Sequence, residues 1–335
     1  MDERFTDSER LQVLSNADSY WDINEQASQC LLESAFSLIN GSPILSGLEQ
    51  KMVGMIEELT NHVENLKKGD WQKRLSIFLT LGYKLIDKIL DEESNIDLSL
   101  KGLDWAKKAG ENDPKDLQKA FHLSMAADFS REIYYEHEEK LDYIVRSLNL
   151  DLRAAELSET LYPKFSGISF TRAAKDAFEI YQRTKGEARI EYLAQNGELN
   201  IKAGKVSLKT NPNHALECFQ FASISFNKAY HRTRKIEYLM RRVEANVLFD
   251  ENQEETQKTS PLIFAANACA QIFRRTNIPT YRTQAIHLYQ RFLGEAYLER
   301  SSDDFIATAR KALSELEEVS SQPNENLFKP ETVFL

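Results

Sequence analysis

Histidine and carboxylates gather in YYEHEEK, residues 134–140, where His137 stands beside Glu136, Glu138 and Glu139. Side chains of these types can bind a divalent metal ion or transfer protons. Consecutive residues of a helix point in different directions around its axis, however, so these four would not converge on one ion. The other histidines form neither an HExxH motif nor a pair at metal-ligand spacing. We interpret the stretch as a solvated charged turn and predict no metal site.

No local motif of a catalytic or nucleotide-binding site occurs in the chain. The three cysteines, Cys30, Cys218 and Cys269, are far apart and form no CxxC, and we expect none of them to lie beside a histidine as a nucleophile would. GxSxG, GxxxxGKS/T and GxGxxG are absent, and the glycines of GELNIKAGKVS (residues 197–207) have the wrong separation for a phosphate loop. The sequence therefore predicts that the protein is not an enzyme and binds no cofactor, although a site assembled from distant residues would leave no such trace.

A basic stretch in the second half of the chain could bind anions. Residues 215–300 hold 12 Lys and Arg against 9 Asp and Glu. Three interpretations stay open: a solvated helix face with i,i+4 ion pairs, a surface for an acidic peptide or for nucleic acid whose bases stack on tyrosines, or a contact with the acidic end of another copy. The partner-binding candidates are Arg232, Arg234, Lys235, Arg241, Arg242, Arg274, Arg275, Tyr230 and Tyr238.

The elements that would carry such residues repeat along the chain. EKLDYIVRSLNLDL (residues 139–152) recurs as ARIEYLAQNGELNI (188–201) and as RKIEYLMRRVEANV (234–247). With Leu141, Ile190 and Ile236 as position 0, apolar or small residues fall at 0, +3, +4, +7 and +11, which is one stripe of an α-helix. A basic residue precedes position 0, an acid follows it, and a tyrosine stands at +2, so we predict equivalent places for these tyrosines. Degenerate copies begin at residue 285 and, more weakly, at residue 75.

Each copy has a predicted partner helix upstream, and in two of these helices the packing residues begin 21 residues before position 0. Small residues spaced by four and three along that helix would let a neighbouring helix approach closely. Asn or Asp before Pro, in residues 111–116 and 210–215, marks the start of such helices. The predicted packing residues of the partner helices are Ala120, Ser124 and Ala127; Ala174, Phe178 and Tyr181; Ala215, Phe219 and Ala222; and Ala266, Ala270 and Phe273.

This arrangement resembles the tetratricopeptide class of helix-hairpin solenoids. Ala215, Phe219 and Ala222 look like the second-helix signature of that repeat, and NPNHA (residues 211–215) looks like its inter-repeat proline turn. The period of 46 to 49 residues differs from the family's 34, and the Trp-x2-Leu-Gly-x2-Tyr half of the signature is missing, so a relative with longer helices fits better. The resemblance covers about residues 111–315. It implies a scaffold that binds partners and transfers no site.

We therefore predict an all-α fold in which antiparallel helix hairpins stack as a right-handed solenoid. The predicted domains are an N-terminal helical bundle or cap (residues 1–110), about four helix pairs (111–320) and an extended C-terminal tail (321–335). Within the first domain, helices are expected at residues 24–39, 46–66, 71–90 and about 98–109. An atypical end is expected of a repeat array, because a terminal repeat needs one polar outer face.

The net charge and the hydropathy of the chain argue against some classes of function. A net charge of −10 does not suit a general nucleic-acid binder. The acidic start MDERFTDSER is not a secretory signal, and no apolar run approaches the roughly 18 residues of a membrane span, so we expect a cytoplasmic protein without membrane contact. The favoured function is a non-catalytic scaffold or adaptor that holds a partner peptide or helix in the solenoid groove. The alternatives are a nucleic-acid-associated or regulatory protein using residues 232–291 and an accessory subunit of an enzyme complex, and homo-oligomerisation stays open.

Overall fold

In a computed structural model the protein is all-helical over the residues that the structure describes, which are 80, 96–138, 140–253, 261–296 and 303–318. This confirms the predicted fold class. The helices expected at residues 24–39 and 46–66, that at 71–90 apart from residue 80, and the tail at 321–335 lie outside the described residues. The described elements are α5 (Ile96–Asn112), α6 (Asp116–Glu132), the π-helix η2 (Ile133–Glu138), α7 (Leu141–Ser158), α8 (Pro163–Arg183), α9 (Ala188–Ser207), α10 (Pro212–Thr233), α11 (Ile236–Asn252), α12 (Pro261–Thr276), α13 (Pro279–Ala296) and α14 (Asp303–Glu318).

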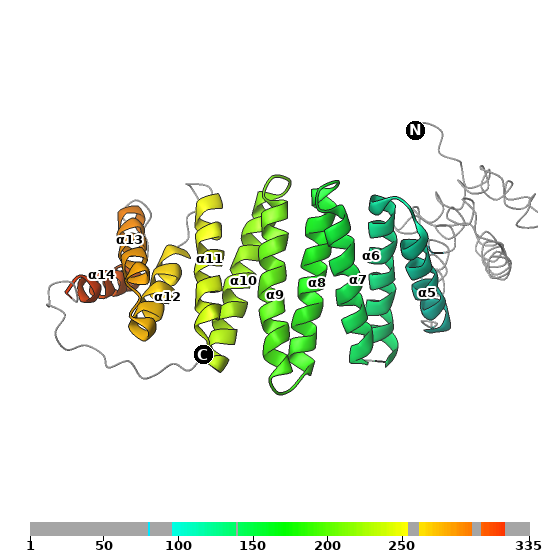
Figure 1. Cartoon of the computed structure of the whole chain (residues 1–335), viewed down its shortest axis with the longest axis horizontal. Helices are drawn as coiled ribbons and strands as arrows, with labels where there is room; N and C mark the ends of the chain where they lie inside the picture. The colour runs from blue at the N-terminus through cyan, green and yellow to red at the C-terminus, as the bar shows by residue number, and fades with distance from the viewer. Residues whose placement is uncertain (1–79, 81–95, 139, 254–260, 297–302, 319–335) are drawn as a thin grey trace, which may run out of the picture. The chain divides into compact units, whose positions relative to one another are not determined.

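The chain divides into two compact units, unit 1 (Met1–Tyr192) and unit 2 (Leu193–Leu335). Within unit 1, α5 packs on α6, α6 on α7 and α7 on α8; within unit 2, α10 to α14 pack on one another in the same consecutive manner. Figure 1 shows α5 to α8, and α10 to α13, running alternately up and down within their units, whereas α14 lies across its neighbour α13. The predicted domain boundaries and the handedness of the stack stay predictions.

The repeated phrase forms the second helix of each pair, as predicted, on α7, α9 and α11. Position +3 is buried in all three copies (Ile144, Leu193 and Leu239), and the tyrosine at +2 is half-buried each time. The sequence interpretation missed position +10, where Asp151, Asn200 and Asn246 are polar and yet buried. The repeat therefore includes a buried polar position that the apolar stripe alone does not reveal.

The first helices also repeat, in a register that the sequence interpretation assigned wrongly for one of them. Every buried residue of α10 has a buried counterpart on α8 49 positions earlier, so that Phe219 and Ala222 correspond to Phe170 and Ala173. The register predicted for α8 is therefore wrong: Ala174 and Tyr181 are buried, but Phe178 is only half-buried. Small residues occur at adjacent places in RAAKDAF, so their spacing alone cannot tell which of them faces the neighbouring helix.

The same hydrogen bond joins successive helices in both units. Ser147 Oγ on α7 donates to Asp176 Oδ2 on α8 at 2.7 Å, and Ser225 Oγ on α10 donates to Asn196 Oδ1 on α9 at 2.6 Å. All four side chains are buried. Ser147 and Asn196 occupy corresponding positions 49 residues apart, and so do Asp176 and Ser225. The serine donor is therefore on the second helix of a pair in one bond and on the first helix of a pair in the other. A buried bond of this kind fixes the register of one helix on the next, because sliding by one residue would leave both groups unsatisfied.

Replacing Ser225 with alanine should lower the free energy of unfolding by about 1–2 kcal/mol, because the buried amide oxygen of Asn196 loses its hydroxyl donor. Urea unfolding followed by far-UV circular dichroism measures this. Ser158→Ala is the control, since the Ser158 hydroxyl is also buried but bonds only carbonyls of its own helix, such as Ala154 O at 2.8 Å. It should cost less than about 0.5 kcal/mol. If both variants lost the same free energy of unfolding, the hydrogen bond between α9 and α10 would add nothing to the stability of the protein.

Candidate functional site

In the described part of unit 1, large apolar side chains are exposed on some elements and not on others. Six of them are exposed, and they lie on α6, on η2, in the turn between α7 and α8, and on α8: Leu117, Phe121, Tyr135, Leu161, Tyr162 and Ile168. Among the described residues of α5 and α7, no large apolar side chain is exposed. A patch restricted in this way is typical of a contact surface, whereas single exposed apolar residues scattered over a surface need no explanation.

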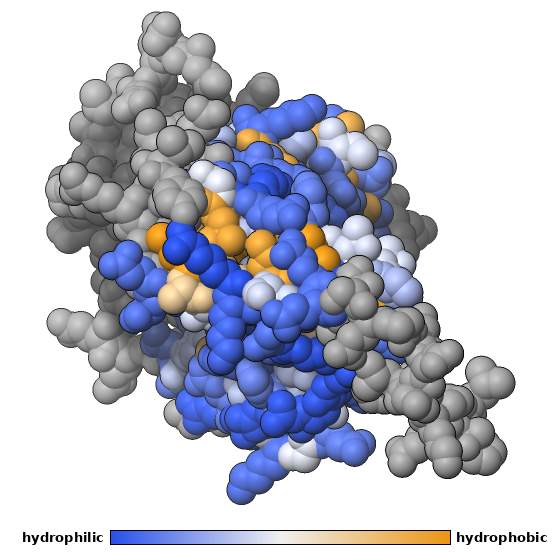
Figure 2. Space-filling view, turned by 90° about the vertical axis from the view of Figure 1, so that its left-hand side faces the viewer, coloured by the Kyte–Doolittle hydropathy of each residue, from blue (hydrophilic) through white to orange (hydrophobic). Residues whose placement is uncertain are grey.

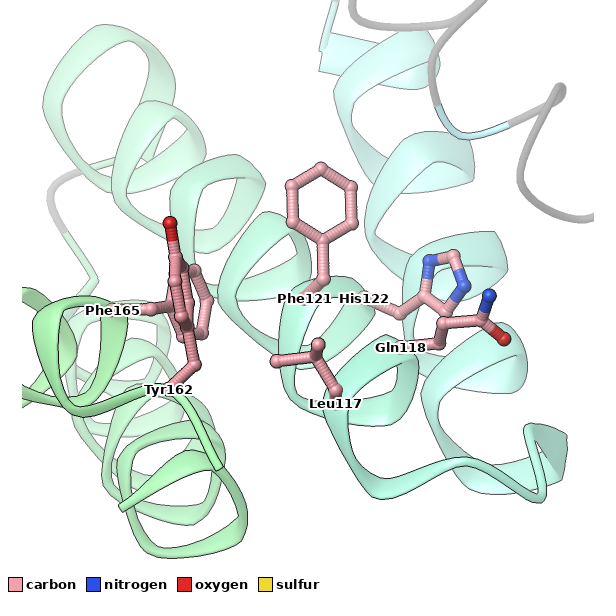
Figure 3. A pocket seen from close by; sticks show the side chains of 6 residues that line it. All are labelled: Leu117, Gln118, Phe121, His122, Tyr162 and Phe165. Carbon is pink, nitrogen blue, oxygen red and sulfur yellow. The ribbon is translucent and has the colours of Figure 1, made fainter. Parts of the chain in front are cut away.

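The patch contains a pocket of about 360 Å³. Leu117 and Phe121 of α6 and Tyr162 and Phe165 at the start of α8 supply its apolar lining, and Gln118 and His122 complete it. Figure 3 shows Leu117 and Phe121 between the Tyr162–Phe165 pair on one side and Gln118 with His122 on the other. Leu117 and Phe121 remain 42% and 44% exposed, so the pocket is open to solvent and large enough for one or two side chains of a partner.

The polar edge of the pocket holds a neutral imidazole. His122 Nε2 lies 3.6 Å from Asp113 Oδ2, and Asp113 Oδ1 accepts a hydrogen bond from the backbone N–H of Lys115 at 2.9 Å. Burial lowers the pKa of His122 despite the neighbouring carboxylate, so the ring carries no charge at pH 7. His122 Nδ1 has no hydrogen-bond partner among the described residues. The lining of the pocket is therefore mainly apolar, and the Nδ1 atom of His122 is buried without a partner among the described residues.

One guanidinium ties three helices together beside the pocket. Arg131 on α6 contacts Asp128 of the same helix (Nη1 to Oδ1, 2.7 Å), Asp176 of α8 (Nε to Oδ1, 2.9 Å) and Asp151 of α7. Arg172 on α8 completes the connection, because its Nη1 lies 3.0 Å from Asp128 Oδ1. We call these five residues the charged cluster; it contains three carboxylates and two guanidiniums.

Burial changes the proton affinities of the charged cluster. Asp151 is fully buried, and desolvation raises its pKa to about 7, although the Arg131 guanidinium acts in the opposite direction. Desolvation likewise raises the pKa of Asp176. Ser124 Oγ donates to Asp151 Oδ1 at 2.9 Å, so the carboxylate is held on both sides. Because three carboxylates surround one buried guanidinium, their mutual repulsion favours the protonated form of one of the carboxyl groups.

The charged cluster is particular to this part of the repeat array. In the register given by the burial pattern, which is 47 positions from α6 to α8, the place of Arg131 on α6 is taken by Phe178 on α8 and by Asn227 on α10, and that of Asp151 by Asn200 on α9. Neutral residues thus build the same helix contacts elsewhere in the chain. A buried ionic cluster that the fold does not require, with raised carboxylate pKa values, is a candidate functional feature.

Much of the predicted basic stretch is engaged in interhelical contacts within unit 2. Arg241 Nε lies 2.5 Å from Glu198 Oε1, and Arg274 Nη2 lies 2.9 Å from Glu315 Oε2. Arg242 donates to Asn227 Oδ1 at 2.8 Å, and its burial lowers its pKa. These contacts neutralise or bury charges that one of the three interpretations of the sequence assigned to a surface for a partner.

The other candidates of the basic stretch lie near the ends of α10 and α12. Arg234 and Arg275 both lie over the Tyr230 ring, at 5.8 and 5.3 Å from its centre, and Arg275 Nη1 donates to the Arg234 carbonyl at 3.2 Å. Tyr230 itself is only 3% exposed, and Tyr238 packs against the core of unit 2. Arg232 and Lys235 are exposed, and Lys235 Nζ lies 3.9 Å from Glu237. Binding of a partner by these nine residues stays a prediction.

Unit 2 has an apolar surface of its own. Figure 2 shows hydrophobic residues gathered within a mostly hydrophilic surface at the end that carries α13 and α14. Phe264 on α12 and Phe305 on α14 are both exposed, and their rings meet edge to face with centres 6.2 Å apart. This is a second candidate contact surface.

One expectation about chemistry is wrong. His214 Nε2 lies 3.6 Å from Cys218 Sγ, one turn along α10, so a cysteine does stand beside a histidine. Cys218 is 1% exposed, and like Cys269 it is a free buried thiol. Within the described part of the chain, no three His, Cys, Asp or Glu side chains are placed to hold a metal ion. Among the described helices, none combines the length and apolarity needed to cross a membrane.

No protein-family model matches the chain. No curated protein matches it either. Among solved structures, a de novo designed helical repeat protein, DHR64, is similar at 15% identity over 81% of this chain and 96% of the designed one, with a TM-score of 0.18. A structure described as the DHF58 filament is similar at 16% identity over 73% of this chain and 91% of that chain, also with a TM-score of 0.18. TM-scores this low carry no argument, and the description of the chain as helical pairs that repeat rests on the burial pattern above.

Proposed function

We propose that the protein is a non-catalytic scaffold that binds a partner protein in a groove between α6 and α8. We define the α6–α8 groove by Leu117, Phe121 and Asp128 on α6 and by Phe165, Ile168 and Arg172 on α8. The observation that carries the proposal is that, among the described residues of unit 1, the exposed large apolar side chains lie on α6, η2, α8 and the turn before α8, and that three of them line an open pocket. Apolar side chains that enter a pocket and exclude water supply most of the energy of such interfaces.

The arrangement of the helices supports this proposal. The two helices are joined across the groove by Arg131 to Asp176 and by Arg172 to Asp128, and Tyr134 Oη of η2 donates to Glu179 Oε1 of α8 at 3.1 Å. Because these contacts already fix the groove in the free protein, a partner need not order it, which lowers the cost of binding. Stacked helix hairpins often present such surfaces to partners.

The nucleic-acid alternative has less support. Arg241 and Arg274 are paired with Glu198 and Glu315, and Arg242 is largely buried. A paired guanidinium gains little from a phosphate, because binding would first break its existing ion pair. The role of an accessory subunit in an enzyme complex is a special case of the scaffold proposal, with an enzyme as the partner.

Phe121→Asp should abolish partner binding while leaving the fold intact, because it places a charge at the centre of the apolar pocket on a residue that is already exposed. The measurement is affinity capture from native lysate with quantitative mass spectrometry, comparing wild type and variant, followed by titration of each captured protein. We expect proteins captured through the groove to bind at least about tenfold more weakly to Phe121→Asp.

The matched control is Phe221→Asp, which changes a phenylalanine that is also exposed on the first helix of a pair, but in unit 2. It should leave capture unchanged, and both variants should keep the melting temperature of the wild type within a few degrees. If every captured protein binds both variants equally well, the α6–α8 groove is not the binding surface.

A further inference from the structure

The two sides of the α6–α8 groove carry opposite charge. On α8, Lys164, Ile168, Arg172 and Lys175 are spaced by four, four and three residues, so they share one face of the helix. Lys164 and Lys175 are exposed, and the acid on the same face, Glu179, is paired with Arg183 at 3.1 Å. We call this face the basic edge.

The α6 side is acidic. Leu117, Phe121, Asp128 and Glu132 also share one helix face, and both of its ionisable residues are acids. Asp128 is partly exposed and contacts Arg131 and Arg172, and Glu132 accepts a hydrogen bond from Ser99 at 3.4 Å. Asp128 is thus paired with two guanidiniums, and Glu132 supplies the remaining negative charge on this side. We call this face the acidic edge.

The dimensions and the backbone of the groove favour a helical occupant. From Leu117 to Glu132, α6 extends for roughly 22 Å at 1.5 Å per residue, the length of a helix of about four turns, and the pocket lies at the start of this stretch. The backbone groups of α6 and α8 are bonded within their own helices, so they offer an extended peptide no strand edge to pair with. A helical partner brings its own backbone hydrogen bonds and needs only side-chain contacts.

We infer that the occupant of the α6–α8 groove is an amphipathic helix of another protein, with its apolar stripe in the pocket, basic residues along the acidic edge and acidic residues along the basic edge. The inference rests on the proposed function, which requires only that the groove binds a protein. It adds the secondary structure of the partner and the order of charges on either side of its apolar stripe.

The test is a selection from a displayed library of helical peptides, about 18 residues long, with the apolar stripe and both flanks randomised. The full chain is the target, and Phe121→Asp is the counter-selection target. Selected peptides are synthesised and titrated by fluorescence anisotropy against the wild type and against Lys164→Glu/Lys175→Glu. A matched control, Lys209→Glu/Lys311→Glu, reverses two exposed lysines of unit 2.

We expect the selected peptides to carry bases on one flank of the stripe and acids on the other. Lys164→Glu/Lys175→Glu should weaken their binding about tenfold, and replacing the acidic flank of the peptide by lysine should restore it. The control variant should bind as the wild type does. Affinity for the wild type should fall with rising salt, since exposed charges carry the orientation.

Other outcomes separate the two proposals. If peptides bind in a Phe121-dependent manner but ignore the charge reversal, or if the selected sequences are proline-rich and extended, the helical, charge-ordered occupant is wrong and the scaffold proposal stands. If no peptide is selected, or if Phe121→Asp binds the peptides as well as the wild type does, both fail. If sedimentation shows a wild-type dimer that Phe121→Asp dissociates, the occupant is a second copy of this chain, which also overturns the inference.

Discussion

Replacing Arg131 with methionine should lower the free energy of unfolding by about 3–5 kcal/mol at pH 8, the largest effect expected of any single substitution in unit 1. Methionine keeps most of the volume but removes the guanidinium that contacts Asp128, Asp151 and Asp176. The buried carboxylates of α7 and α8 would then face one another without the cation between them. The loss reflects the cost of uncompensated buried charge and exceeds what the ion pairs add in the wild type.

The loss should shrink as the pH falls. The pKa of Asp151 is about 7 in the folded wild type and has a normal value of 3.8, so between about pH 4 and 7 the folded state holds a proton that the unfolded state has released. Stability from this group is therefore fully present below pH 4 and is lost as the pH rises through 7. Without Arg131 the pKa values of Asp151 and Asp176 rise further, so the loss continues above pH 7. The variant should approach the wild type at pH 5 and depart most from it at pH 8.

Asp151→Asn separates charge from packing. Asparagine fills the same space, occurs at this position on α9 and α11, and removes the excess carboxylate, so Arg131→Met/Asp151→Asn should recover part of the stability that Arg131→Met loses. Urea unfolding at pH 5, 6.5 and 8, with hydrogen exchange of α6 to α8 by mass spectrometry, measures both effects. A cost for Arg131→Met below about 1 kcal/mol, or one that does not change with pH, would contradict the bridging role of this guanidinium.

The second helices of the pairs could be predicted from the sequence because two independent patterns agree there. The apolar stripe indicates a helix, and the repeated base, acid and tyrosine around position 0 align the three copies. The burial of Leu148, Gly197 and Val243 at the same place follows from this alignment. On the first helices only small residues were available as a signal, and these pack equally well in adjacent registers, which is why the triplet on α8 was assigned wrongly.

The charged cluster and the pocket could not be predicted in the same way. Arg131, Asp151 and Asp176 stand 20 or more residues apart in the sequence, and a charged residue within a helix is normally assigned to its solvated face. One signal was available: Asp151 and Asn200 occupy the same repeat position, and a polar residue kept at a buried place needs a partner. The ion pairs of the basic stretch could not be predicted either, because a count of arginines does not show the Glu198 and Glu315 that pair with them.

Replacing Gly204 with leucine should lower the free energy of unfolding by about 3 kcal/mol, because α9 has no room for a side chain where it meets α10. A Cβ added at Gly204 would lie 2.5 Å from Phe219 Cε1, and one added at Gly197 would lie 2.6 Å from Phe226 Cζ. Both rings are buried in unit 2 and cannot move away without opening the core. Glycine usually costs a helix interior up to about 1 kcal/mol, so its use at both contacts indicates that close approach outweighs helix propensity.

Gly294→Ala is the matched control, because this glycine also lies within a helix, α13, but an added Cβ would meet nothing within 4 Å. Alanine there should raise the free energy of unfolding by about 0.5–1 kcal/mol through helix propensity alone. Gly204→Ala should instead lower the free energy of unfolding. In the double variant Gly204→Ala/Phe219→Leu, the shorter side chain opposite should restore part of that loss. Urea unfolding of the four variants compares these effects directly. If Gly204→Ala stabilised the protein as Gly294→Ala does, α9 and α10 would not be in the close contact that the repeat requires. The alignment of Phe170 with Phe219 would then not indicate equivalent packing of the two rings.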